Sequence, residues 1–137
     1  SDGSVIRYTD IKYGGSYSRG TVYMSSSAAS IENSLITHSA NEGITVSSGS
    51  PSITNTTITE SDDYGIDESS VTNLVFENNT ITNNAKALKS DKLDILLDST
   101  STMTGNTQGA VIGSYTMDTG TLSGTLVTTD DYSVTIA

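Results

Sequence analysis

The chain has 137 residues, the size of one ordinary domain, and six Lys and Arg residues stand against 16 Asp and Glu residues, a formal net charge of −10. This charge argues against binding to nucleic acid or to an anionic membrane surface, because both are polyanions. The chain has no Cys, which excludes disulfides and thiolate metal sites. No apolar run approaches the ~20 residues of a transmembrane helix, so we expect no membrane insertion.

Short alternating apolar runs bounded by Gly, Asn and Ser recur along the chain and predict short β-strands. Ile44-Thr45-Val46 is typical, and no 3.6-residue stripe of a helix is present. Three series of apolar positions share one period of 22 to 25 residues. The first series is Ile6, Ile31, Ile53 and Phe76; the second is Ile11, Ile36, Ile58, Ile81 and Met103; the third is Val22, Ile44, Ile66, Leu88 and Val111.

This period predicts an all-β fold, a parallel β-helix (β-solenoid) with about 22 residues per coil. One repeat of short strands cannot bury its own apolar face, so successive repeats must stack at about 4.8 Å, the spacing between paired strands. We expect five to six coils within residues 1–115. The first coil is three residues longer than the others, and we expect the extra residues to form an outward loop in 12–20 (KYGGSYSRG).

Asn recurs two residues after the first apolar series, at Asn33, Asn55 and Asn78. Asn tolerates the left-handed backbone that a sharp bend requires. Stacked amides can also form hydrogen bonds from one coil to the next. We therefore expect these three residues to form a structural ladder at one bend of the coil.

Five carboxylates lie within nine residues and form the densest acidic cluster of the chain. Oxygen-rich clusters suit calcium, which takes six to eight oxygen ligands. A solvated acidic turn is the simpler explanation of the cluster and is the interpretation we favour. Adjacent strand residues point to opposite faces, so Asp62 and Asp63 make a poor acid/base pair. The candidate calcium ligands are Glu60, Asp62, Asp63, Asp67 and Glu68.

Two single residues need separate interpretation. His38 is the only His, and without a neighbouring Cys, a second His or an obvious carboxylate partner we expect an ordinary surface residue. Glu68 falls in register with Met24 and Val46, which are expected to face inward. Burying an unpaired carboxylate is costly, so we expect the strand to end before Glu68.

The motifs VIRYTDIKYGG, SIENSLITHSANEGITVSS, PSITNTTITESDDYGIDESS and FENNTITNNAKALKSD combine an apolar-x-Asn bend, a Thr-flanked Ile and a Gly-Ile or its equivalent. In this the chain resembles the right-handed parallel β-helix repeat proteins of the pectate-lyase-like class, most of all their extracellular members. The resemblance covers about residues 4–115. It implies a right-handed coil with three sheets, with a glycan-related surface role in many members and an architectural or adhesive role in others.

A Thr-x-Thr pattern repeats in consecutive coils and predicts two outward columns of Thr side chains. This array resembles the Thr-x-Thr face of solenoid ice-binding proteins, and the resemblance implies ice binding. Thr is also a favoured residue of exposed strands, which is the simpler explanation. The residues of the two columns are Thr57, Thr59, Thr80, Thr82, Thr102 and Thr104.

Residues 116–137 depart from the repeat. We expect strands around Thr128–Asp131 that either complete the solenoid or begin a following module. Neither end of the chain has an evident capping helix, so self-stacking or contact with adjacent modules is expected. We expect a noncatalytic extracellular or cell-surface module with a structural, adhesive or glycan-contacting role. The alternatives are a calcium-dependent carbohydrate-active module, similar to a polysaccharide lyase or hydrolase, and an ice-binding protein.

Overall fold

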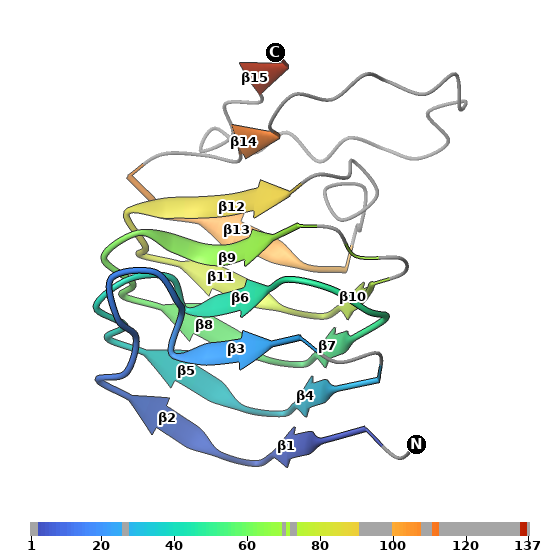
Figure 1. Ribbon diagram of the computed structural model, residues 1–137. Helices are drawn as coiled ribbons and strands as arrows, with labels where there is room; N and C mark the ends of the chain where they lie inside the picture. Colours follow the sequence, from blue (N-terminus) through green and yellow to red (C-terminus); the bar gives the residue numbers. More distant parts are fainter. Residues whose placement is uncertain are drawn as a thin grey trace.

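The protein is a parallel β-solenoid in which three sheets run along the sides of the coil. The computed structural model describes residues 3–25, 28–69, 71, 74–90, 100–107, 111–112 and 135–136. Every strand pair in this part of the chain is parallel, and each strand pairs with the equivalent strand of the neighbouring coil (Figure 1). The predicted fold class is confirmed. Within these residues, no helix is long and apolar enough to cross a membrane.

The three sheets contain four, five and six strands within the described residues. The first sheet consists of β1 (Val5–Arg7), β4 (Ser30–Glu32), β7 (Ser52–Thr54) and β10 (Val75–Glu77). The second consists of β2 (Asp10–Lys12), β5 (Leu35–Thr37), β8 (Thr57–Thr59), β11 (Thr80–Thr82) and β13 (Thr102–Thr104). The third consists of β3 (Val22–Met24), β6 (Ile44–Val46), β9 (Tyr64–Glu68), β12 (Lys86–Ser90), β14 (Val111–Ile112) and β15 (Thr135–Ile136).

The predicted apolar series are in register from coil to coil, with one exception. Ile31 pairs with Ile6 and Ile53, Ile58 pairs with Ile36 and Ile81, and Ile66 pairs with Ile44 and Leu88. Val111 was wrongly placed in the third series, because it pairs with Lys89, one residue beyond Leu88. Val111 and Ile112 are both apolar, so hydrophobicity alone could not distinguish two registers that differ by one residue.

The core is a narrow stack of aliphatic side chains from the three sheets. Full burial of one such side chain contributes about 1.5–3 kcal/mol. The largest apolar side chains with essentially no exposed surface are Ile31, Ile36, Ile44, Ile53, Ile58, Ile66, Ile81 and Leu88.

Two left-handed bends turn the chain in each regular coil. Asn33, Asn55 and Asn78 have φ angles of 49°, 50° and 54°, which confirms the predicted conformation at the first bend. The second bend follows the second sheet, and the sequence did not reveal it, because its residues differ in type from coil to coil. Its left-handed residues are Tyr13, His38, Glu60, Asn83 and Gly105.

At the first bend, the side-chain hydrogen bonds between coils come from the residue after the predicted one. These residues are Ser34, Asn79 and Ser101, of which only Asn79 is an amide. Asn33 and Asn55 are exposed, and their backbone N–H groups donate to the carbonyl oxygens of Thr54 and Glu77. Asn79 is buried, and its Oδ1 accepts a hydrogen bond from the N–H of Thr56 at 3.0 Å. The left-handed residue points its side chain outward. The next residue along the chain faces the interior, and its side chain accepts a hydrogen bond from a backbone N–H group of the neighbouring bend.

An amide ladder of Asn84 and Asn106 follows the second bend. Oδ1 of Asn84 accepts from the N–H of Ser61 at 2.9 Å, and its Nδ2 donates to the carbonyl of Ile58 at 3.2 Å. Asn106 repeats both contacts one coil later, with the N–H of Asn84 and the carbonyl of Ile81. These bonds satisfy backbone groups that the bends would otherwise bury without partners.

The long first coil contains the predicted outward loop. Ser16 and Arg19 exchange two backbone hydrogen bonds of 2.9 and 3.0 Å around the exposed Tyr17. The amide of Asn41 in the next coil donates to the carbonyl of Ser16 at 2.9 Å and holds the loop against the solenoid (Figure 1, blue connection between β2 and β3).

The sequence predicted that the strand containing Ile66, now seen as β9 of the third sheet, ends before Glu68, and this prediction was wrong. β9 continues through Glu68, whose side chain is only 1% exposed. Its carboxylate accepts hydrogen bonds from the hydroxyl of Ser90 and from the N–H of Val71. The partners offset the cost of burying the carboxylate, and the sequence did not reveal them because Ser90 lies 22 residues away.

The C-terminal prediction falls mostly outside the described residues, including the strands expected around 128–131. β15 is described and pairs in parallel with β14, so Thr135 and Ile136 extend the third sheet.

Candidate ligand-binding site

The five candidate calcium ligands occupy three separate environments. On the outer face of the third sheet, Asp63 Oδ1 lies 2.6 Å from Lys86 Nζ, and Asp67 Oδ2 lies 2.8 Å from Lys89 Nζ. The hydrogen bond to Asp63 raises the pKa of the Lys86 ammonium above its ordinary value of 10.5. The Lys86 ammonium also lies 4.6 Å from the centre of the Tyr64 ring. Two of the five acids are therefore paired with lysines from the next coil.

The remaining three acids point in different directions. Glu68 faces the interior, while Glu60 and Asp62 are exposed near the second bend. Across the described part of the chain, no group of three or more His or acidic residues is arranged to hold a metal ion. Calcium binding stays a prediction, and the acids do not form the single cluster that their spacing suggested.

The Thr side chains of the second sheet form the two predicted columns. Thr57, Thr80 and Thr102 are paired in register, and the same holds for Thr59, Thr82 and Thr104. Most of these residues are half-exposed, because their side chains alternate with the buried Ile58, Ile81 and Met103. The result is an outward surface of hydroxyl and methyl groups. One coil earlier, the residue in register with Thr59 is Thr37, which is buried.

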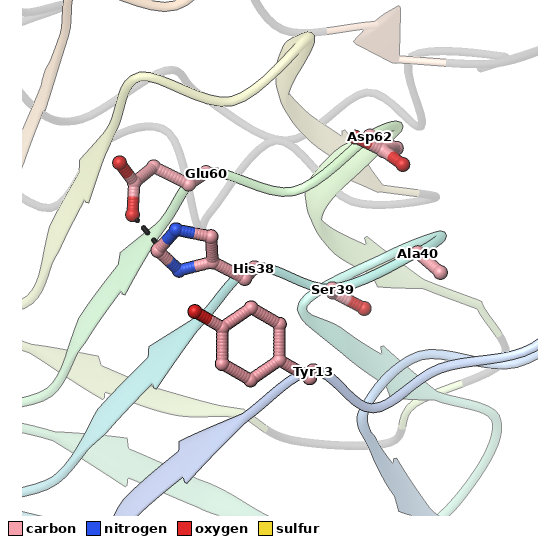
Figure 2. Close-up of a pocket in the computed structure, with 6 residues that line it drawn as sticks. All are labelled: Tyr13, His38, Ser39, Ala40, Glu60 and Asp62. Carbon is pink, nitrogen blue, oxygen red and sulfur yellow. Dashed lines mark ion pairs between the residues drawn. The ribbon is translucent and has the colours of Figure 1, made fainter.

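A shallow cleft of about 300 Å³ opens where the second column meets the second bend. It is lined by Tyr13, His38, Ser39, Ala40, Glu60 and Asp62, which come from three consecutive coils. Figure 2 shows His38 between Tyr13 and Glu60, with Asp62 apart from these three side chains. Successive coils place the three left-handed residues above one another, because their separations of 25 and 22 residues match the coil lengths.

The His38 side chain has partners on both sides. Its ring centre lies 4.9 Å from that of Tyr13, with a tilt of 43° between the planes. Its Nδ1 lies 3.1 Å from Glu60 Oε2 and 2.8 Å from the hydroxyl of Thr37. The Thr37 hydroxyl donates to Glu60 Oε2 at 2.8 Å. His38 is a surface residue as predicted, but it has a carboxylate partner, and the spacing of 22 residues from His38 to Glu60 was the signal that could have identified it.

The cleft therefore combines an aromatic surface with free hydrogen-bond acceptors. One oxygen of Glu60 is engaged by Thr37 and His38, while its second oxygen, the Asp62 carboxylate and the Tyr13 hydroxyl have no partner within the described residues. Such an arrangement suits a ligand that presents both an apolar face and hydrogen-bond donors.

Comparison with known proteins agrees with the architecture. Residues 1–134 match the family model described as the right handed beta helix region. The chain belongs to this family, and the solenoid is a right-handed β-helix module. Neither the comparison with curated proteins nor that with solved structures gave a match.

Proposed function

We propose that this β-helix is a noncatalytic extracellular or cell-surface module that contacts glycans and serves an adhesive role. The observation that carries the proposal is the surface of the second sheet, where Thr side chains stand in two registered columns on paired parallel strands. Hydroxyl groups at a regular spacing can exchange hydrogen bonds with a repeating polymer of sugar hydroxyls. The exposed Tyr13 of the first coil adds aromatic surface at the second bend, which follows the second sheet.

The outer face of the third sheet supports the noncatalytic part of the proposal. Acid/base catalysis needs carboxylates free to exchange protons with a substrate. Asp63 and Asp67 are instead held by Lys86 and Lys89 at 2.6 and 2.8 Å. The extracellular location is supported by the acidic composition, in which six basic residues stand against 16 acidic ones.

The test is affinity electrophoresis of the protein through gels that contain soluble polysaccharides, with and without calcium. The ultraviolet absorbance of unsaturated sugar products is recorded in parallel. We expect retardation without product, and we expect the double substitution Thr59→Lys and Thr82→Lys to reduce it. Product formation would overturn the noncatalytic proposal in favour of a lyase. Retardation that requires calcium would instead favour the acidic residues as a metal-dependent site.

Ice binding is a second candidate, supported by the registered Thr columns themselves. The measurement is thermal hysteresis in a nanolitre osmometer, with the Thr59→Lys and Thr82→Lys protein as the control. A freezing-point gap that disappears in this variant would establish ice binding.

The ends of the solenoid suggest a structural contact in addition. Within the described residues, β1, β2 and β3 lie at the edges of their sheets, where unpaired backbone groups can accept another strand. We propose that this edge pairs with an adjacent module or with a second copy of the chain. Sedimentation velocity over a range of concentrations tests self-association, and a constant monomer mass would exclude it over that range.

A further inference from the structure

We propose that the cleft at the second bend is a saccharide subsite, with Tyr13 as its stacking platform and Glu60 and Asp62 as its hydrogen-bond acceptors. The ligand is a sugar without acidic groups, either neutral or amino-substituted. This inference rests on the proposed glycan-contacting function and assigns it to one place on the surface.

The platform is an exposed aromatic ring that is held in position. The Tyr13 side chain is 77% exposed, yet its backbone N–H donates to the carbonyl of Thr37 at 3.3 Å and its ring contacts that of His38. A pyranose ring presents a face of C–H groups that packs on such a surface. The two-torsion side chain of Tyr loses little conformational entropy when a ligand binds.

The polar groups of the cleft determine the charge of the ligand. The free oxygen of Glu60 and the Asp62 carboxylate only accept hydrogen bonds, so the ligand must supply donors, as sugar hydroxyl or ammonium groups do. The cleft already holds the two carboxylates of Glu60 and Asp62, and a uronic acid would add a third negative charge there. The whole chain also has a net charge of −10, which repels an acidic ligand. The cleft therefore selects against acidic sugars.

The site is organised before a ligand arrives. Thr37 is only 4% exposed, and its hydroxyl lies 2.8 Å from both Glu60 Oε2 and His38 Nδ1. The N–H of Asp62 donates to the carbonyl of Ser39 at 2.9 Å, which fixes the opposite side of the cleft to the neighbouring coil. Groups held by buried partners need little ordering on binding, which favours affinity.

The experiment measures binding of three oligosaccharide probes by isothermal titration calorimetry: a neutral glucan, an oligomer of glucosamine and an oligomer of galacturonate. We expect binding of at least one of the first two and none of the third. Tyr13→Ala should weaken binding at least tenfold, and Asp62→Asn and Glu60→Gln at least threefold each. Circular dichroism melting curves check that each variant is folded.

Matched controls are available elsewhere on the chain. Tyr8 is also exposed and left-handed, at the first bend of the same coil, so Tyr8→Ala removes an equivalent ring away from the cleft. Glu77→Gln removes an exposed carboxylate on the first sheet. Both should leave the dissociation constant within twofold of the unsubstituted protein.

The outcomes separate this inference from the proposed function. If binding survives Tyr13→Ala but is lost in the Thr59→Lys and Thr82→Lys protein, the cleft is not the saccharide subsite. The proposal that the Thr surface contacts glycans would then still stand. Binding of galacturonate alone would overturn the assigned ligand class. Absence of binding to all soluble polysaccharides and to all three probes would overturn both proposals.

Discussion

The carboxylate of Glu68 and the hydroxyl of Ser90 form a buried hydrogen bond between β9 and β12, where the two residues are directly paired. Both side chains are essentially inaccessible to solvent, in a column that begins with the apolar Met24 and Val46. The bond joins two coils at the point where the chain leaves the third sheet.

Replacing Ser90 with Ala should lower the free energy of unfolding by about 1–3 kcal/mol, because a buried oxygen of Glu68 loses a donor. Urea denaturation followed by circular dichroism measures the change. The control is Ser52→Ala in β7 of the first sheet, which removes a half-exposed hydroxyl. This substitution should change the free energy of unfolding by no more than about 0.5 kcal/mol. Equal effects of the two substitutions would show that the buried bond adds nothing.

Replacing Ser61 with Asn should raise the free energy of unfolding by about 1 kcal/mol. Ser61 Oγ is the one described side-chain atom that is buried without a hydrogen-bond partner. An Asn at this position can reach the N–H of Ser39 and the carbonyl of Ile36, as Asn84 does with Ser61 and Ile58 one coil later. The reciprocal change, Asn84→Ser, should destabilise the protein. A loss of stability in Ser61→Asn would mean that the ladder cannot extend to this coil.

Replacing Gly65 with Ala should destabilise the protein by about 1–3 kcal/mol through overpacking. An added Cβ would lie 2.6 Å from Cγ2 of Ile81 and 2.9 Å from the backbone oxygen of Ala87. Ala87 occupies the equivalent position one coil later, so Ala87→Gly is the control and should cost no more than about 1 kcal/mol. Thermal and urea unfolding of both variants test the comparison, which fails if Gly65→Ala is as stable as the parent.

Stability should depend on pH through Lys86 and Asp63. The hydrogen bond to Asp63 raises the pKa of Lys86 in the folded state. The contribution of the protonated Lys86 to the free energy of unfolding is therefore fully present below the ordinary pKa of 10.5, and it is lost as the pH rises through the higher folded-state pKa. The pair is partly exposed, so the contribution should be under about 1 kcal/mol.

The measurement compares the free energy of unfolding of the parent and of Lys86→Met from pH 8 to pH 12. The advantage of the parent should be constant up to pH 10 and decline above it. Lys12→Met is the matched control, because the Lys12 ammonium is 3.8 Å from Asp10 and the pair is more exposed. A parent advantage that grows above pH 10 would contradict the assigned direction.

Replacing Ile58 with Asp should prevent stable folding, because it places a carboxylate at the centre of the core with no partner, a cost of several kcal/mol or more. Thr59→Lys, at the adjacent outward position, should change stability by only about 0.5 kcal/mol. Circular dichroism and gel filtration distinguish the two outcomes, and a folded Ile58→Asp protein would contradict the assigned core.

The apolar series and the coil length were predictable, because a parallel solenoid repeats its inward positions at the period of the chain. Ile36, Ile58 and Ile81 are paired as that period requires. The bend conformation at Asn55 was also predictable, since few residues other than Gly and Asn adopt positive φ readily. The register predicted from the period was wrong at Val111, because Val111 and Ile112 are both apolar and permit two registers.

The contacts between coils depended on the tertiary structure. The sequence by itself determined the repeat, the core and the outward Thr columns, because these follow from which residues recur and from the alternation of strand side chains. The partnership of His38 with Glu60, the pairing of Asp63 with Lys86 and the buried bond of Glu68 join residues 22 or 23 apart that differ in type. Whether such groups meet depends on rotamers and on the exact register of each coil, and only the folded stack determines both.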